Sequence, residues 1–118
     1  RNLLLAVNET VGLAATTNVK DLLANDPSLF QFPVLYLHGR TKFSFAEDER
    51  RQLRDHLLRG GVLIADACCG SAAFDKSFRE LMAQLVPESP LSAVPVTHEL
   101  FGEQVGHDVR RVKRRTID

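Results

Sequence analysis

The chain has 118 residues, of which 44% are hydrophobic and 25% are charged, and its formal net charge is zero. This length allows one domain with a hydrophobic core, and the charge balance excludes a strong overall attraction to nucleic acid or to an anionic membrane. No apolar run approaches the roughly 20 residues that a membrane-spanning helix needs. Because the first residue is Arg1 rather than Met, we expect residues 1–118 to be a single α/β domain cut from a longer chain, and the compartment stays open.

The first third of the chain contains a helical pattern, a turn and a strand. Apolar residues recur at helical spacing near its start: Leu4, Val7, Val11 and Ala14. This spacing predicts an amphipathic helix over residues 2–14, and residues 16–20 are β-prone. Residues 25–28, Asn-Asp-Pro-Ser, are typical of a turn. Residues 32–37, Phe-Pro-Val-Leu-Tyr-Leu, are mostly apolar on both faces, which predicts a strand in the middle of a sheet that helices cover.

A second helix and a second strand follow. Ser44 and Glu47 have the spacing of a capping box, with Ser44 as the N-cap, so we predict a helix from there to Arg59. His56 lies near the edge of the apolar face of this helix, and we interpret it as a half-exposed surface residue. Residues 62–66, Val-Leu-Ile-Ala-Asp, predict a second strand of the same covered kind.

A third helical pattern begins near Phe74 and stops before Pro87. Its apolar face consists of Phe74, Phe78, Leu81, Met82 and Leu85. Beyond it, residues 93–97 predict a short edge strand, and residues 108–116 are compatible with β-structure. Five cations crowd this last segment: Arg110, Arg111, Lys113, Arg114 and Arg115. Because no aromatic residues are interleaved with them for base stacking, we interpret them as solvated charge on a strand edge and expect no nucleic-acid partner.

The order of these elements predicts an α/β fold with a mainly parallel sheet. The stretch from the first strand through the second helix to the second strand is a βαβ crossover, which is right-handed and makes the two strands parallel. His38, Gly39 and Arg40 follow the first strand, and Asp66 ends the second. We therefore expect these residues at one edge of the sheet, the edge at which ligands of open α/β sheets bind.

A series of motifs appears in one order along nearly the whole chain. They are Phe32-Pro-Val-Leu-Tyr-Leu-His-Gly-Arg40, Phe43-x-Phe45, Leu53-Arg54, Arg59-Gly-Gly61, Asp66-Ala-Cys-Cys-Gly-Ser71, Phe74-Asp-x-Ser-Phe-Arg79 and His98-x-Leu-Phe101. This series resembles the bacterial domain-of-unknown-function family forty-one fifty-nine. The resemblance implies a three-layer α/β/α fold, flavodoxin-like or similar to the class I glutamine amidotransferases, with further strands beyond Thr116. It implies no established activity.

The turn after the second strand supports a catalytic hypothesis. Amidotransferase-like enzymes place a cysteine on a strained turn with small residues two positions to either side, and Cys69 meets that rule, with Cys68 as its neighbour. A thiol at a helix N-terminus has a lowered pKa, and His98 with Glu99 is the candidate base and carboxylate. The amidotransferase pattern, however, separates these two residues by one position, and adjacent residues on a strand point to opposite faces. The alternative is that both cysteines are small, buried apolar residues.

A second hypothesis is a ligand site without catalysis. Its candidate binding residues are His38, Gly39, Arg40, Asp66, Gly70 and Ser71. The glycines expose backbone N–H groups at strand ends, Arg40 offers a planar fork for carboxylate or phosphate, and Ser71 with the following helix N-terminus favours an anion. The alternatives are that Arg40 pairs with Asp66, and that Asp66 ties down backbone donors of the turn.

The residue types that zinc accepts also occur at this edge, namely His38, Asp66, Cys68, Cys69 and His98. They lack Cys-x-x-Cys or His-x-x-x-His spacing, so we predict no metal site, and without a glycine-rich phosphate motif we predict no nucleotide or other cofactor. We expect a non-catalytic binding or assembly module of a larger bacterial protein, whose partner is a small anionic ligand or another protein domain. The alternative is a cysteine-dependent amidohydrolase or amidotransferase-like enzyme.

Overall fold

The structure is a computed structural model that describes residues 5–6, 9, 12 and 19–104. The chain divides into two units, residues 1–87 and 88–118, and each is described by itself. The segment 108–116 lies outside the described residues, as does most of the predicted helix over 2–14, of which residues 5, 6 and 9 are helical. No helix among the described residues is both long and apolar enough to cross a membrane.

From residue 19 onward, the first unit contains two strands, two α-helices and two short 3-10 turns. In chain order they are η1 (Pro27–Gln31), β1 (Val34–Gly39), α2 (Glu47–Leu58), β2 (Val62–Ala67), η2 (Cys68–Gly70) and α3 (Ala72–Leu85). In the second unit, the described residues contain the 3-10 turn η3 (Glu99–Phe101). The predicted strand over residues 93–97 is wrong, because this segment has no regular structure before the turn that leads into η3. Pro90 and Pro95 explain this, since neither can donate a backbone hydrogen bond to a sheet.

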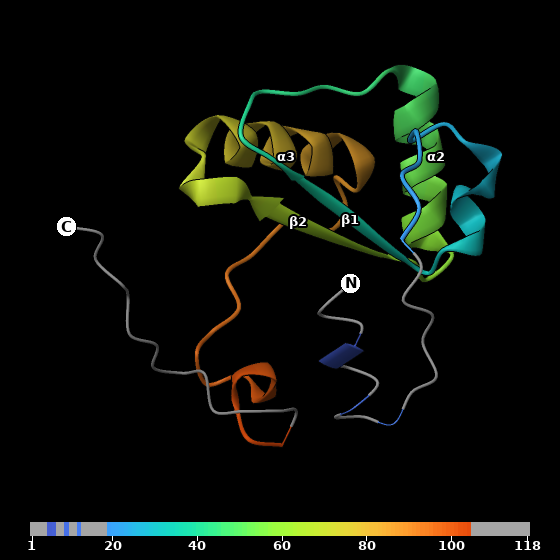
Figure 1. The fold of residues 1–118 in the computed structure, drawn as a ribbon. Helices are drawn as coiled ribbons and strands as arrows, with labels where there is room; N and C mark the ends of the chain where they lie inside the picture. Colours follow the sequence, from blue (N-terminus) through green and yellow to red (C-terminus); the bar gives the residue numbers. More distant parts are fainter. Residues whose placement is uncertain (1–4, 7–8, 10–11, 13–18, 105–118) are drawn as a thin grey trace. The chain divides into compact units, whose positions relative to one another are not determined.

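The two strands pair in parallel, as the βαβ pattern predicts (Figure 1). The register places Val34 opposite Val62 at one end of the pair and His38 opposite Asp66 at the other. The prediction that the tips of both strands lie at one edge is therefore confirmed. We call this edge, formed by residues 38–40 and 66–71, the rim.

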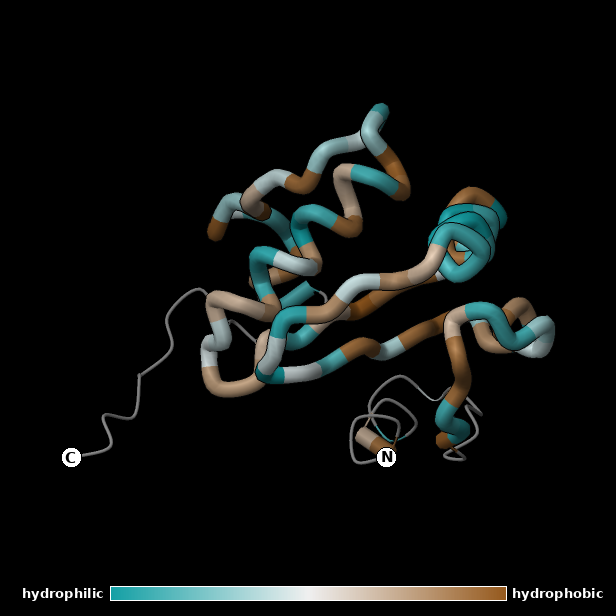
Figure 2. Tube along the Cα trace, turned by 90° about the horizontal axis from the view of Figure 1, so that it is seen from above, coloured by the Kyte–Doolittle hydropathy of each residue, from teal (hydrophilic) through white to brown (hydrophobic). Residues whose placement is uncertain are grey.

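The mixed α/β fold is clear, but the described sheet has two strands, and one of its faces is open. Val34, Tyr36, Val62 and Ile64 alternate along the strands and are 40–60% exposed. Figure 2 shows brown, apolar stretches along the strands. Within the part of the chain that the structure describes, this face has no cover, so strands covered on both faces stay a prediction. Apolar character on both faces requires a cover in the complete fold, but it does not say which segment supplies it.

The opposite face of the sheet carries the core. Its buried residues are Leu29, Leu53, Phe74, Leu81 and Leu85. Leu35 of β1 packs against this cluster, as do Phe78 and Met82 of α3, so the apolar face predicted for α3 is confirmed. The helix ends at Leu85, before Pro87, as predicted.

Helix α2 begins later than the capping-box pattern predicts. Its N-cap is Ala46, whose backbone N–H donates to Glu49 Oε2 at 2.6 Å, so Glu49 rather than Glu47 reaches back. The predicted Ser44 cap is therefore wrong. The reason is tertiary: Phe43 and Phe45 pack against the core, and the Phe43 backbone N–H donates to buried Ser77 Oγ at 3.2 Å. The segment stays extended to make these contacts, and the helix forms only after it.

His56 is buried rather than half-exposed, with 4% of its surface accessible. Its Nε2 lies 2.7 Å from the backbone oxygen of Phe32, so the Nε2–H tautomer donates to that carbonyl. Its ring occupies the space beside Gly61, where a Cβ would meet the ring atoms at 2.1–2.7 Å. The chain therefore folds back over the imidazole because residue 61 has no side chain. The predicted surface position was wrong because this contact depends on a residue beyond the helix.

We predict that Gly61→Ala destabilises the protein by about 1–3 kcal/mol, because the new methyl group forces the His56 ring out of its site. Chemical denaturation of the single variants and of the double variant with His56→Ala measures this effect. The added methyl should cost much less in the His56→Ala background, where the ring is absent. Equal costs in both backgrounds would contradict the packing.

A second prediction separates the two capping residues. Glu49→Ala removes the acceptor of the Ala46 N–H and should cost about 0.5–1 kcal/mol of stability. Ser44→Ala should change stability by less than about 0.5 kcal/mol, because Ser44 precedes the helix by more than one residue. Urea unfolding of both variants provides the comparison. A larger loss for Ser44→Ala would mean that the helix begins where the sequence pattern places it.

Candidate functional site

The rim is built by two strand ends and the turn that joins β2 to α3. Gly39 ends β1 opposite Ala67, and the chain then continues through η2 into α3. Ser71 is the N-cap of α3, and its Oγ accepts from the Phe74 N–H at 3.2 Å. The same hydroxyl donates to the backbone oxygen of Arg40 at 2.5 Å. One side chain therefore fastens the end of β1 to the turn after β2.

The open face of the sheet contributes three side chains next to the rim. Tyr36, His38 and Asp66 project to this face, because alternate strand residues point the same way. The Tyr36 hydroxyl donates to Asp66 Oδ2 at 2.9 Å, and the Tyr36 and His38 rings lie 5.7 Å apart. The hydrogen bond to the Asp66 carboxylate raises the pKa of Tyr36. The partner of Asp66 is therefore a tyrosine hydroxyl, which neither of the alternatives considered for Asp66 includes.

Tyr36 is not predicted as a site residue from the sequence, because it is treated there as one of the apolar residues of the strand over 32–37. A signal for it exists in the sequence. Tyr36 precedes His38 by two positions, so in a strand both face the same side. Pairing with Asp66 could be predicted only with the parallel register known.

Arg40 and the two thiols form the centre of the rim. The Arg40 guanidinium donates to Cys69 Sγ at 3.2 Å, and the two sulfur atoms lie 3.6 Å apart. Arg40 and Cys69 are exposed, whereas Cys68 is partly exposed. The hypothesis that both cysteines are small, buried apolar residues is therefore wrong. Arg40 also pairs with the thiols rather than with Asp66.

The guanidinium distinguishes the two thiols electrostatically. The Arg40 guanidinium is the main cause that lowers the pKa of the Cys68 thiol, and the neighbouring Cys69 thiol lowers it further. The pKa of Cys69 is raised, chiefly by its hydrogen bond and charge interaction with Cys68. The guanidinium therefore favours a thiolate at Cys68, whereas the small-residue rule points to Cys69 as the nucleophile.

The backbone of Cys69 matches the strained turn that was expected. Its φ is 60° and its ψ is 25°, a left-handed conformation that costs a residue with a Cβ more than it costs glycine. Gly70 follows with a φ of 72°. A Cβ on Gly39 would lie 3.0 Å from the Phe74 ring, so this glycine allows β1 to pack closely on α3. Gly70 is therefore explained by its backbone conformation and Gly39 by its packing, without reference to a ligand.

His98 belongs to the second unit. Its Nδ1 accepts from the Leu100 N–H at 3.1 Å and so caps η3, of which Glu99 is the first residue. Its role as a base for the thiols stays a prediction. Among the residues that the structure describes, no group of three or more His, Cys, Asp or Glu side chains could hold a metal ion.

The comparison with family models agrees with the order of motifs along the chain. The model of the family described as Domain of unknown function (DUF4159) matches residues 1–114. A search of the curated proteins finds no relative that matches. Since the family model covers nearly all of the 118 residues, including both strands and every residue of the rim, the chain belongs to the DUF4159 family.

Proposed function

We propose that this chain is a non-catalytic binding module of a larger bacterial protein, and that its rim binds a small anionic ligand. The single observation that carries the proposal is the exposed Arg40 guanidinium at the shared carboxyl edge of two parallel strands. This edge is where open α/β sheets bind ligands. A guanidinium has five N–H donors in a fixed plane, and a carboxylate or phosphate can accept two of them at once.

The contacts around Arg40 favour binding. Ser71 holds the Arg40 backbone through its carbonyl, so the guanidinium starts from a fixed point on the rim. The Asp66 carboxylate accepts from Tyr36 rather than from Arg40, whose guanidinium donates to a thiol. An anion that approaches the rim therefore meets a cation without a carboxylate hydrogen-bonded to it in the described part of the chain.

The open face of β1 and β2 supports the finer fold proposal. Strands with apolar residues on both faces are stable where helices or further strands cover them. We therefore propose a three-layer α/β/α arrangement, flavodoxin-like or glutamine-amidotransferase-like, for the complete sheet. Under this proposal Val34, Tyr36, Val62 and Ile64 are covered in the intact protein.

A cysteine-dependent amidohydrolase is the second candidate, and two observations favour it. Arg40 lowers the pKa of Cys68, and Cys69 adopts a left-handed backbone at a strand-to-helix turn. Against it, no imidazole or carboxylate in the described part of the chain hydrogen-bonds to either thiol. Nucleophilic catalysis by cysteine needs a base within hydrogen-bonding reach. Binding without catalysis is therefore the better-supported function.

We predict that succinate or inorganic phosphate stabilises the protein against heat through Arg40. A ligand at about ten times its Kd should raise Tm by about 5–10 °C, and Arg40→Gln should abolish most of that shift. Arg79→Gln is the matched control, because it removes one exposed arginine whose partner is Asp75 on α3 rather than a rim thiol. Equal shifts in the wild-type protein and in both variants would rule out the anion site.

The rate of thiol alkylation as a function of pH tests the electrostatics of the rim. Because the pKa of Cys68 is lowered, its reaction with iodoacetamide should reach half its maximal rate below pH of about 8.5. Arg40→Gln should move this midpoint upward, because the neutral side chain no longer stabilises the thiolate. Cys68→Ser leaves only Cys69, which identifies the thiol that reacts first. An alkylation midpoint that is the same in the wild type and in Arg40→Gln would contradict the interaction between Arg40 and the thiols.

The same protein separates the two candidate functions with p-nitrophenyl acetate. A binding module should release at most one equivalent of nitrophenol per reactive thiol and then stop. Repeated turnover that is lost in both Cys68→Ser and His98→Ala would favour the hydrolase and overturn the proposed function.

A further inference from the structure

The turn η2 places the two cysteines of the 118-residue sequence next to each other at the surface. Their sulfur atoms lie 3.6 Å apart, Cys69 is exposed and Cys68 is partly exposed. A small oxidant in solution can therefore reach this pair of thiols. The proposed anion site depends on the Arg40 guanidinium and gives the two thiols no function of their own.

Arg40 holds one of the two sulfur atoms in place. Its Nη2 donates to Cys69 Sγ at 3.2 Å, and the Ser71 hydroxyl donates to the Arg40 backbone oxygen. The guanidinium therefore fixes the Cys69 sulfur beside Cys68 and places a positive charge next to both thiols. A positive charge beside a thiol favours the thiolate, which is the reactive form of cysteine. In agreement, the Arg40 guanidinium lowers the pKa of Cys68.

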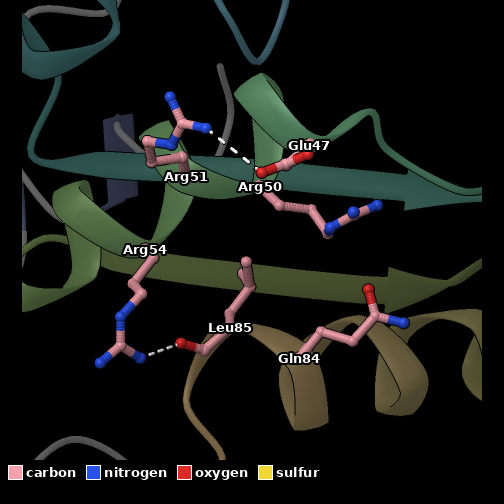
Figure 3. A pocket seen from close by; sticks show the side chains of 6 residues that line it. All are labelled: Glu47, Arg50, Arg51, Arg54, Gln84 and Leu85. Atoms are coloured by element: carbon pink, nitrogen blue, oxygen red, sulfur yellow. Dashed lines mark hydrogen bonds and ion pairs between the residues drawn. The ribbon is translucent and has the colours of Figure 1, made fainter.

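A sulfur acceptor sets Arg40 apart from the arginines of α2. Arg50 and Arg54 donate to backbone oxygens, and Arg51 pairs with a carboxylate at 3.3 Å. Figure 3 shows that the guanidinium groups of these three residues point apart around a solvent-open hollow. They therefore do not converge on one ligand, whereas Arg40 and the two thiols form a compact group.

A metal ion does not suit this group. Among the residues that the structure describes, no third His, Cys, Asp or Glu side chain completes a metal site with the two thiols. The Arg40 guanidinium would also repel a cation bound to the sulfur atoms. The pair of thiols is therefore better suited to chemistry between the two sulfur atoms themselves.

The turn has room for the two sulfur atoms to move together. Cys69 has a left-handed backbone, with a φ of 60°, and Gly70 follows with a φ of 72°. A Cβ on Gly70 would meet no atom within 4 Å, so the space beside the pair is open. A disulfide bond has a length of about 2 Å, and the sulfur atoms can approach each other without displacing a packed side chain at Gly70.

We propose that Cys68 and Cys69 are a site of reversible oxidation, at which a peroxide converts the two thiols into a disulfide between neighbouring residues. Accessible thiols that lie beside a second thiol are the type of cysteine that peroxides oxidise in this way. Cys68 is the first thiol to react, and Cys69 is the thiol that closes the bridge.

The reaction balances with one molecule of hydrogen peroxide. The Cys68 thiolate attacks one peroxide oxygen, so that an S–O bond forms and the O–O bond breaks, and the departing hydroxide takes up the proton that Cys68 released. The Cys69 sulfur then attacks the Cys68 sulfur of this sulfenic acid. The S–S bond forms, the S–O bond breaks, and the hydroxyl group leaves as water with the Cys69 proton. Two thiols and one peroxide thus give one disulfide and two water molecules.

The position of the two residues in the chain makes the disulfide easy to reduce. The Cα atoms of adjacent residues lie about 3.8 Å apart, whereas a relaxed disulfide usually joins Cα atoms at least about 4.4 Å apart. The bridge is therefore strained, and strained or exposed disulfides are the labile ones. A dithiol reductant restores the two thiols by thiol–disulfide exchange.

The test is the intact mass of the 118-residue chain after treatment with an equimolar amount of hydrogen peroxide at micromolar protein concentration. The monomer should lose about 2 Da, the mass of two hydrogen atoms, and dithiothreitol should restore the original mass. Because the sequence contains two cysteines, a disulfide within one chain can join only this pair. This measurement uses the wild-type protein, so it does not depend on how any variant folds.

Variants test the role of each group. In Cys69→Ser the sulfenic acid at Cys68 has no neighbouring thiol, so dimedone should trap it, and it should trap less in Cys68→Ser. Arg40→Gln should form the same disulfide at least about threefold more slowly at neutral pH, because less of Cys68 is thiolate. Arg79→Gln is the control, because the partner of Arg79 is Asp75 rather than a thiol, and its rate should equal that of the wild type.

Three results would overturn the inference. They are a wild-type chain that keeps its mass or gains about 16 Da per added oxygen atom instead of losing hydrogen, a disulfide that links two chains instead of one, and an oxidation rate that is the same in Arg40→Gln as in the wild type. The inference does not rest on the proposed anion site. The mass of the chain reports the disulfide whether or not an anion binds, and the thermal shift with succinate or phosphate reports the anion site separately.

Discussion

The parallel pairing of β1 and β2 is the constraint on which the candidate site depends. Parallel strands cannot be joined by a tight turn, so the chain must cross over through α2 and return to the same starting edge. Both strand ends then arrive together, with His38 opposite Asp66. An antiparallel pair would place Arg40 and the thiols at opposite ends of the sheet. The contact between the guanidinium and Cys69 exists because the crossover forbids that arrangement.

At the rim, the positive charge of Arg40 gives two neighbouring cysteines different pKa values. Cys68 and Cys69 are adjacent in sequence and lie 3.6 Å apart at their sulfur atoms. Two thiolates so close would repel, so the loss of one proton opposes the loss of the other. Arg40 stabilises the first thiolate, at Cys68, and this charge then raises the pKa of Cys69. The pKa of each thiol therefore depends on the charge of the other.

Two unlike residues hold the first unit together at opposite ends. At the rim, the Ser71 hydroxyl joins the end of β1 to the start of α3. At the far end, the buried His56 ring joins α2 to the backbone of Phe32, and Gly61 provides the room for it. Both are polar side chains that satisfy backbone groups of another element, as buried backbone groups require. Burial of the open apolar face of β1 and β2 would add further stability in the complete fold.

The sequence by itself determined the parallel crossover, the strand ends that share an edge, and the apolar face and end of α3. These follow from patterns within single segments and from the handedness of βαβ units, which is the same in nearly all proteins. The start of α2 could not be predicted in the same way, because it depends on tertiary packing. The N-cap moved from Ser44 to Ala46 because packing of Phe43 and Phe45 against the core outweighed a local hydrogen bond.

Only the tertiary structure decided the side-chain partners. Arg40 contacts the thiols, Asp66 accepts from Tyr36, and His56 is buried beside Gly61. Each of these contacts joins residues on different elements, or residues that a turn brings back together, so no local pattern contains it. Local periodicity specifies where a residue sits on its own element, whereas the register and packing of elements specify what it meets.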